Sequence, residues 1–118
     1  MVFLTISVTN ECGYYVAAHS TIAAQQSHMP KPVIEALRQG AILPDSRLQA
    51  LSHFTKAMVT QNGWVKNDDT QLFLDAGFTE NQILAVILAV GIKTLSNYTN
   101  HVANTPVDPV FKAQEWHK

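Results

Sequence analysis

Apolar and small residues dominate the amino-terminal stretch, where positions 2–26 hold no proline and a single glycine. Such a stretch suits one continuous helix, because nothing in it interrupts the backbone hydrogen bonds. Further on, apolar residues recur every three or four positions between Leu48 and Met58, which is typical of a helix with one buried face. No alternation of apolar and polar residues persists for more than four positions. The pattern therefore predicts helices and no strand.

Proline, glycine and capping residues mark where the helices begin and end. Pro32 fits the first turn of a short helix, and Gly40 follows it as the usual residue after a helix end. Asp45 and Asn67 are good amino-terminal caps for two further helices. These signals predict helices over residues 2–26, 32–39, 45–62, 67–76, 79–103 and 109–116. We therefore expect a single all-α domain of five or six helices that spans residues 1–118.

The helix predicted over 79–103 is the most apolar segment of the chain. Thr79 and Gln82 have the spacing of a capping box at its start. From Ile83 to Ile92 it is apolar on every side, so we expect it at the centre of the fold or at a subunit interface. That run is shorter than the roughly 18 apolar residues that span a bilayer, so we expect no membrane partner.

Composition and charge exclude several classes of function. Eight Lys and Arg against nine Asp and Glu give a net charge of −1, so the basic field that nucleic-acid binding requires is absent. Only 14% of the residues are charged, against about 25% in typical domains, which suggests that copies of the chain cover part of the surface. No Lys or Arg precedes Lys31, so we expect no secretory signal and a cytoplasmic location.

The single cysteine, Cys12, allows neither an intramolecular disulfide nor a thiolate-rich metal cluster. No histidine pair has the spacing of a metal site, and no glycine-rich phosphate loop occurs. We therefore predict neither a metal nor a cofactor.

The segment from Asn10 to His19 holds the residues most suited to chemistry. On a helix, Cys12 and Tyr15 are three positions apart and Tyr15 and His19 four, so all three share one face. A histidine near a thiol lowers the thiol pKa and produces the nucleophilic thiolate. Cys12 and His19 are two helical turns apart, roughly 10 Å along the axis, so we expect no direct contact between them. Position 15 lies halfway and can meet both.

This segment resembles the AhpD-like alkylhydroperoxidase and carboxymuconolactone decarboxylase family, whose signature is Cys-x-x-Cys-x-x-x-His on a helix. The matching residues are Cys12, Tyr14, Ala17, Ala18 and His19. Further similar stretches cover residues 48–54, 76–78, 93–101 and 105–108, together with Trp116. The resemblance thus extends over nearly the whole chain.

The resemblance implies an all-helical bundle, here short at its amino terminus, that assembles as a homo-oligomer such as a trimer or hexamer. In the peroxidase members, which are antioxidant oxidoreductases, the second cysteine attacks the peroxide and the first closes a disulfide. A thiol or lipoyl reductant then resets the pair. The histidine and a glutamate about three turns upstream relay protons.

The sequence departs from this signature at two positions. Tyr15 stands where the attacking cysteine belongs, and a phenol that titrates near pH 10 is a poor nucleophile that closes no disulfide. The relay glutamate would precede Met1, and Glu11 points away from the relay face. The resemblance therefore implies a peroxidase-like enzyme whose activity is weak or lost.

Candidate site residues are Cys12, Tyr15 and His19, each with a structural alternative. Cys12 is either a residual redox thiol or a small buried residue. His19 is either a proton relay and polar anchor or a core histidine. We expect Tyr15 to fill the reactive pocket with its hydroxyl hydrogen-bonded to His19. A polar cluster from Asn97 to His101 is expected to bond between helices or subunits.

Two other functions stay open. One is acid–base catalysis of the carboxymuconolactone decarboxylase type, for which Arg38 and Arg47 are the only arginines available to hold a substrate carboxylate. The other is a non-catalytic oligomeric domain that binds a small ligand or a protein.

Overall fold

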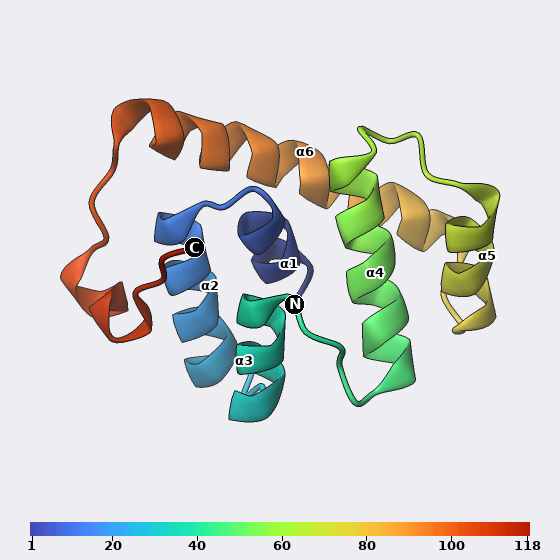
Figure 1. The fold of residues 1–118 in the computed structure, drawn as a ribbon, viewed down its shortest axis with the longest axis horizontal. Helices are drawn as coiled ribbons and strands as arrows, with labels where there is room; N and C mark the ends of the chain where they lie inside the picture. Colours follow the sequence, from blue (N-terminus) through green and yellow to red (C-terminus); the bar gives the residue numbers. More distant parts are fainter.

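The computed structural model describes all residues from Met1 to Lys118, and its regular elements are all helices. The chain forms six α-helices and one 3-10 helix, η1, and Figure 1 labels the α-helices along the ribbon. They are α1 (Val2–Thr9), α2 (Gly13–Gln25), α3 (Lys31–Gln39), α4 (Ser46–Thr60), α5 (Asn67–Asp75), α6 (Glu80–Ala103) and η1 (Pro109–Gln114). The all-α prediction is confirmed, with one helix more than the pattern predicts.

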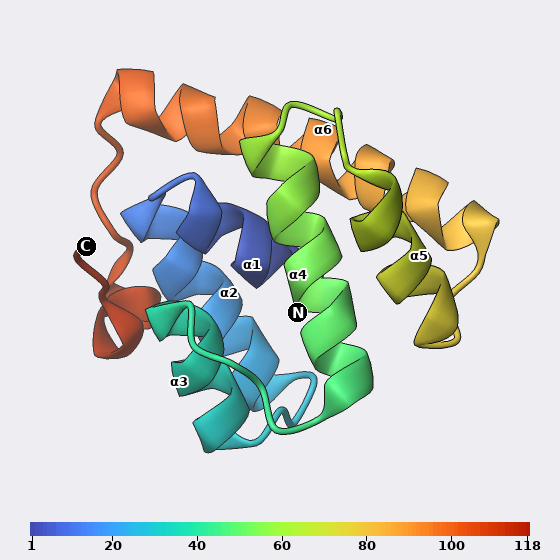
Figure 2. The same ribbon diagram turned by 45° about the vertical axis from the view of Figure 1, so that its right-hand side comes forward.

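The short helix α1 lies at the centre and contacts α2, α3, α4 and α6 (Figure 1). The long helix α6 runs across one side of the molecule and connects the α4–α5 half with the half that holds α2 and η1 (Figure 2). The chain end then returns to α2 through η1. The carboxyl end of the chain therefore lies beside α2, near the turn between α1 and α2.

The extra helix arises because residues 2–26 do not form one continuous helix. The chain turns between α1 and α2 at Glu11, which adopts a left-handed conformation with φ 57°. The Cys12 amide donates to the Ser7 carbonyl oxygen at 2.9 Å and closes this turn. Glycine and asparagine are the usual residues in that conformation. A glutamate at position 11 therefore does not predict a turn there. The turn allows α2 to pack back against α1.

The other helix boundaries follow the capping signals closely. Gly40 ends α3 in the left-handed conformation, with φ 64°. The Asp45 carboxylate accepts the Leu48 amide at 2.8 Å, and Thr79 with Gln82 forms the predicted capping box of α6. Two details differ: Lys66, not Asn67, is the cap of α5, and the last helix ends at Gln114, before Trp116.

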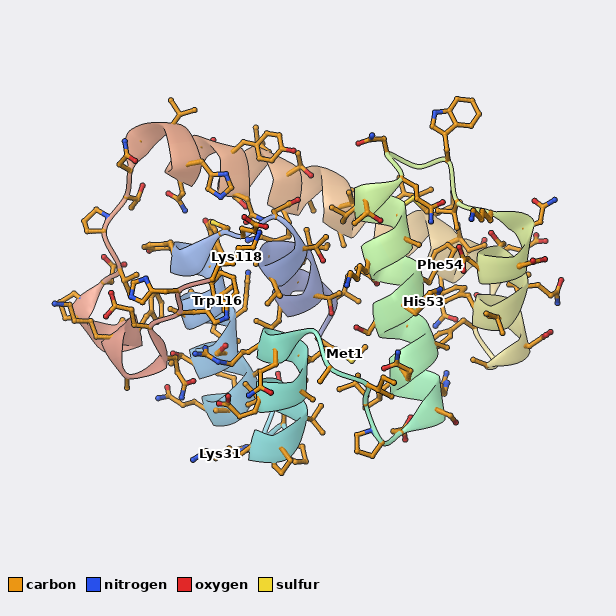
Figure 3. The ribbon with its side chains drawn as sticks, in the orientation of Figure 1. Met1, Lys31, His53, Phe54, Trp116 and Lys118 are labelled. Carbon is orange, nitrogen blue, oxygen red and sulfur yellow. The ribbon has the colours of Figure 1, made fainter.

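Two apolar clusters form the interior. The first lies where α1, α2 and α3 meet and contains Leu4, Val16, Ala23, Ile34, Leu37 and Leu43. The second joins α4, α5 and α6 and contains Phe54, Met58, Phe73 and Val86. The rings of Phe54 and Phe73 stack with their centres 4.3 Å apart, where α4 contacts α5. Figure 3 labels Phe54 on the side of α4 that faces α5.

Helix α6 is not central within a single chain, although it is the most apolar helix. Only Val86, Lys93 and Asn97 are buried along it, while Leu84, Leu88, Leu95 and Val102 are largely exposed. Its length and composition would also allow it to cross a membrane, and 17% of its most apolar 18-residue window is buried inside the fold. The prediction that this helix lies at the centre of the fold is wrong. The alternative prediction, that it lies at a subunit interface, stays open.

The carboxyl-terminal segment, from η1 to Lys118, packs against α2 and α3 (Figure 3). The Trp116 indole donates to the Arg38 carbonyl oxygen at 3.2 Å. The Arg38 guanidinium in turn donates to the carbonyl oxygens of Gln114 and Glu115, at 3.0 and 3.1 Å. Lys118 pairs with Glu11 at the α1–α2 turn. The turn before Cys12 is therefore held by the last residue of the chain.

Candidate functional site at the start of α2

Cys12 is the residue that precedes the first residue of α2 and is 1% exposed. Its Sγ approaches the main-chain oxygen of Asn97 on α6 at 3.9 Å. Burial raises the pKa of the Cys12 thiol, and the Tyr15 amide and the positive charge of Lys93 offset only part of that effect. The thiol therefore stays protonated near neutral pH, in the form that is the weaker nucleophile.

Tyr15 and His19 lie together, as their helical spacing predicts, but in a different geometry. Their rings stack with centres 5.4 Å apart and planes inclined by 20°. His19 Nε2 is buried and has no hydrogen-bond partner. The predicted bond from the Tyr15 hydroxyl to the imidazole is therefore wrong, because a stacked ring directs its hydroxyl along the ring plane and past its neighbour.

The His19 imidazole is held in its neutral form. The Phe3 ring also lies next to it, tilted by 40° with the ring centres 5.4 Å apart. Burial, followed by the charges of Lys93 and the chain amino group, lowers the pKa of His19 to about 4. No hydrogen bond links this imidazole to Cys12. His19 can therefore exchange a hydrogen bond with a neutral group, but it does not lower the thiol pKa.

Lys93 on α6 is the site residue to which the sequence analysis gives no role. It is 4% exposed, and its Nζ lies 3.3 Å from the centre of the Tyr15 ring and 5.4 Å from that of Phe3. Aromatic faces attract a cation and partly replace the water that the ammonium loses. Burial still lowers the pKa of Lys93 to about 8. The only feature of the sequence that could have identified Lys93 as a site residue is that it is a single lysine within a long apolar helix.

The polar cluster on the second half of α6 forms few of the expected bonds. The Asn97 side chain is fully buried, and neither its Oδ1 nor its Nδ2 has a partner. Asn100 Oδ1 accepts the Thr105 hydroxyl at 2.7 Å, within the same segment. Tyr98 is 55% exposed and stands outside the site.

The structure therefore brings Cys12, Tyr15 and His19 together where α1, α2 and α6 meet, and adds Lys93 and Phe3 to them. No group of three or more His, Cys, Asp or Glu side chains is placed to hold a metal ion. The site thus consists of the neutral imidazole of His19, the buried thiol of Cys12 and the desolvated ammonium of Lys93, which surround the phenol of Tyr15. Compared with models of protein families and with curated proteins, the chain matches none.

Proposed function

We propose that this chain is a catalytically inactive relative of the AhpD-like hydroperoxide reductases. It keeps the first cysteine and the histidine of their site, Cys12 and His19, but does not reduce peroxides. The observation that carries the proposal is the placement of Tyr15. At the position expected for the attacking sulfur, its ring contacts both the Lys93 ammonium and the His19 imidazole. The phenol thus fills the space in which a peroxide would have to meet a thiolate.

The chemistry of thiol peroxidases supports the same conclusion. A thiolate attacks the O–O bond, takes one oxygen as a sulfenic acid and releases the other as an alcohol or water; a second thiol then displaces the hydroxyl as water and forms a disulfide. Cys12 has no second thiol in the chain. It is also buried, with its pKa raised. Without turnover of this kind the protein needs no thiol or lipoyl reductant.

The decarboxylase alternative has less support. A substrate carboxylate needs an accessible cation. Lys93, the cation at the site, is 4% exposed and lies over the Tyr15 ring, and both arginines are engaged elsewhere. Arg38 donates to Ser20 Oγ at 3.0 Å and to the chain end, while the Arg47 guanidinium carbon lies 4.7 Å from the centre of the Phe78 ring. No arginine therefore faces the His19 imidazole.

The substitution Tyr15→Cys tests the proposal, because it restores the pair of cysteines. Peroxide loss is followed in the presence of dithiothreitol for the unaltered protein, for Tyr15→Cys and for the control Tyr14→Cys. We expect no loss beyond the protein-free rate for the unaltered protein. Only in Tyr15→Cys should peroxide drive the formation of a disulfide between Cys12 and the introduced thiol. Turnover by the unaltered protein that equals or exceeds that of Tyr15→Cys would overturn the proposal.

We also propose that α6 joins copies of this chain into a homo-oligomer. Its exposed residues Leu84, Leu88, Leu95 and Val102 repeat at intervals of four and seven, the spacing of an apolar seam between helices. Tyr98 is exposed on the same helix. A second copy supplies a matching apolar seam, because a two-fold interface pairs the same surface with itself.

A further inference from the structure

The outer face of α6 carries a seam of exposed residues, called the α6 seam below. Its members alternate at intervals of four and three positions, the spacing with which two helices pack along one another. At 1.5 Å per residue the seam is about 27 Å long. No helix covers the outer side of the carboxyl-terminal half of α6 (Figure 1, Figure 2). The α6 seam consists of Leu84, Leu88, Gly91, Leu95, Tyr98 and Val102.

The charge and the size of this surface fit a second copy of the chain. Lys93 is the only Asp, Glu, Lys or Arg residue between positions 81 and 103, and it is buried, so two seams meet without like charges in contact. The five larger side chains of the seam are 55–85% exposed. Together they offer roughly 600 Å² per copy, of the order of the 800 Å² or so that each partner buries in a standard interface. Ile87 and Ile92 are exposed beside them.

Gly91 is the member of the α6 seam that the fold of a single chain does not explain. It lies in the middle of a long helix, where only proline is less favourable than glycine. A Cβ atom at this position would meet nothing within 4 Å, and the φ angle is not positive. Neither space nor backbone conformation within the chain therefore requires a glycine. A glycine on an exposed helix face leaves room for the close approach of another molecule.

The direction of the second helix follows from which residues face each other. In a parallel pair each seam residue faces its own copy, so Gly91 would face Gly91 and leave a void, which costs stability. In an antiparallel pair centred at position 93, Gly91 faces Leu95 of the second copy and the void is filled. Antiparallel helices also place opposite ends of their dipoles together. The two outer layers of this pair join Leu88 to Tyr98 and Leu84 to Val102.

We propose that two copies of the chain pair through antiparallel α6 seams, with Leu95 of each copy packed over Gly91 of the other. This inference rests on the homo-oligomer proposed above and adds the surface that pairs, its direction and its centre. The arrangement is two-fold, so both copies use the same surface. It serves equally as the contact of a dimer and as the two-fold contact of a larger assembly with dihedral symmetry.

Cysteine cross-linking determines the direction of the pair. Leu84→Cys and Val102→Cys are produced separately and by co-expression, and the buried Cys12 stays in place. After mild oxidation we expect a disulfide-linked dimer from the co-expressed variants. Either variant alone should give no more cross-linking than the control Leu72→Cys, whose side chain is exposed on α5. A parallel pair gives the reverse result, because each variant then links to itself, and would overturn the proposal while the homo-oligomer stands.

A residue swap tests the layer at the centre of the pair. Gly91→Leu places two leucines in the space of one, so the dissociation constant measured by analytical ultracentrifugation should rise roughly tenfold or more, the range for an overpacked contact. The double change Gly91→Leu with Leu95→Gly returns one leucine and one glycine to each layer and should restore association. Tighter association of Gly91→Leu, or no recovery in the double variant, would overturn the proposal.

Failure of the homo-oligomer itself gives a different result. If the unaltered protein sediments as a monomer, both this proposal and the homo-oligomer are wrong. Co-sedimentation of that monomer with phosphatidylcholine vesicles would show that the apolar face of α6 binds lipid instead. An oligomer that shows the expected cross-links and the recovery on swapping supports the antiparallel pair.

Discussion

Acidification should destabilise the fold through His19. The pKa of this imidazole falls from 6.5 to about 4 on folding, mainly because the ring is buried. Between these two values the unfolded chain binds a proton that the native protein does not bind. The stability that depends on a neutral His19 is therefore complete above pH 6.5 and is lost progressively as the pH falls towards 4.

The shift sets an upper limit to this loss. Each pKa unit corresponds to about 1.4 kcal/mol, so the displacement of the His19 pKa from 6.5 to about 4 corresponds to at most about 3.5 kcal/mol. The ring is of intermediate exposure, and solvent screening reduces that figure; we expect about 2 kcal/mol. Burial also lowers the pKa of the Met1 amino group from 8.0, so its contribution to stability begins to be lost below pH 8, at higher pH than that of His19. Lys93 adds nothing, because it stays charged throughout this range.

Urea unfolding at several values between about pH 7 and pH 4 measures the effect. In His19→Leu the histidine contribution disappears, while that of Met1 remains, so the two pH profiles differ by the share of His19 alone. His117→Leu serves as the control and should follow the unaltered protein. If His19→Leu loses as much stability on acidification as the unaltered protein, the imidazole is not held neutral by the fold and the reasoning fails.

Three further substitutions test other parts of the structure. Lys93→Met removes a positive charge that favours the Cys12 thiolate, so the pKa of the Cys12 thiol should rise further. The pH profile of iodoacetamide labelling measures this pKa. An unchanged profile would show that Lys93 does not stabilise the thiolate. If α6 joins copies of the chain as proposed, the unaltered protein is an oligomer in light scattering and the double change Leu88→Glu with Leu95→Glu is a monomer, whereas an unaltered protein that is already monomeric refutes the α6 interface. Trp116→Phe removes one hydrogen bond to α3 and should cost about 1 kcal/mol in urea unfolding, so an unchanged midpoint would show that the chain end adds no stability.

Each of these changes has a matched control on the same protein. Lys56→Met removes an exposed lysine, and Leu72→Glu adds charge at an exposed leucine of α5. Trp64→Phe alters an indole that is 86% exposed. None of the three should change the property that its partner variant changes.

The helices are predictable where local chemistry decides them. Asp45 and Thr79 cap their helices through hydrogen bonds to amides three residues away, and Gly40 ends α3 because a left-handed residue is needed there. The turn at Glu11 is not predictable in this way. The packing of α2 on α1 and the contacts of the chain end stabilise it, and these join residues far apart in the sequence.

Of the site, the sequence predicts only that Tyr15 and His19 lie on the same face of one helix. The positions of Tyr15 and His19, four apart on α2, place their rings together, but spacing does not decide between stacking and a hydrogen bond. Lys93 comes from another helix, 78 positions after Tyr15. Its effect on the pKa of both Cys12 and His19 depends on how α6 packs against α1 and α2, which no local pattern shows.

The central claim is that the folded protein shields Cys12 from peroxide. Its most direct test compares how fast hydrogen peroxide converts this thiol to a sulfenic acid, trapped with dimedone and measured by mass spectrometry, in the folded protein and in urea. Because burial raises the thiol pKa in the native state, we predict that Cys12 reacts more slowly in the folded protein than in the unfolded chain. Faster oxidation of the folded protein would show an activated thiolate and contradict the account.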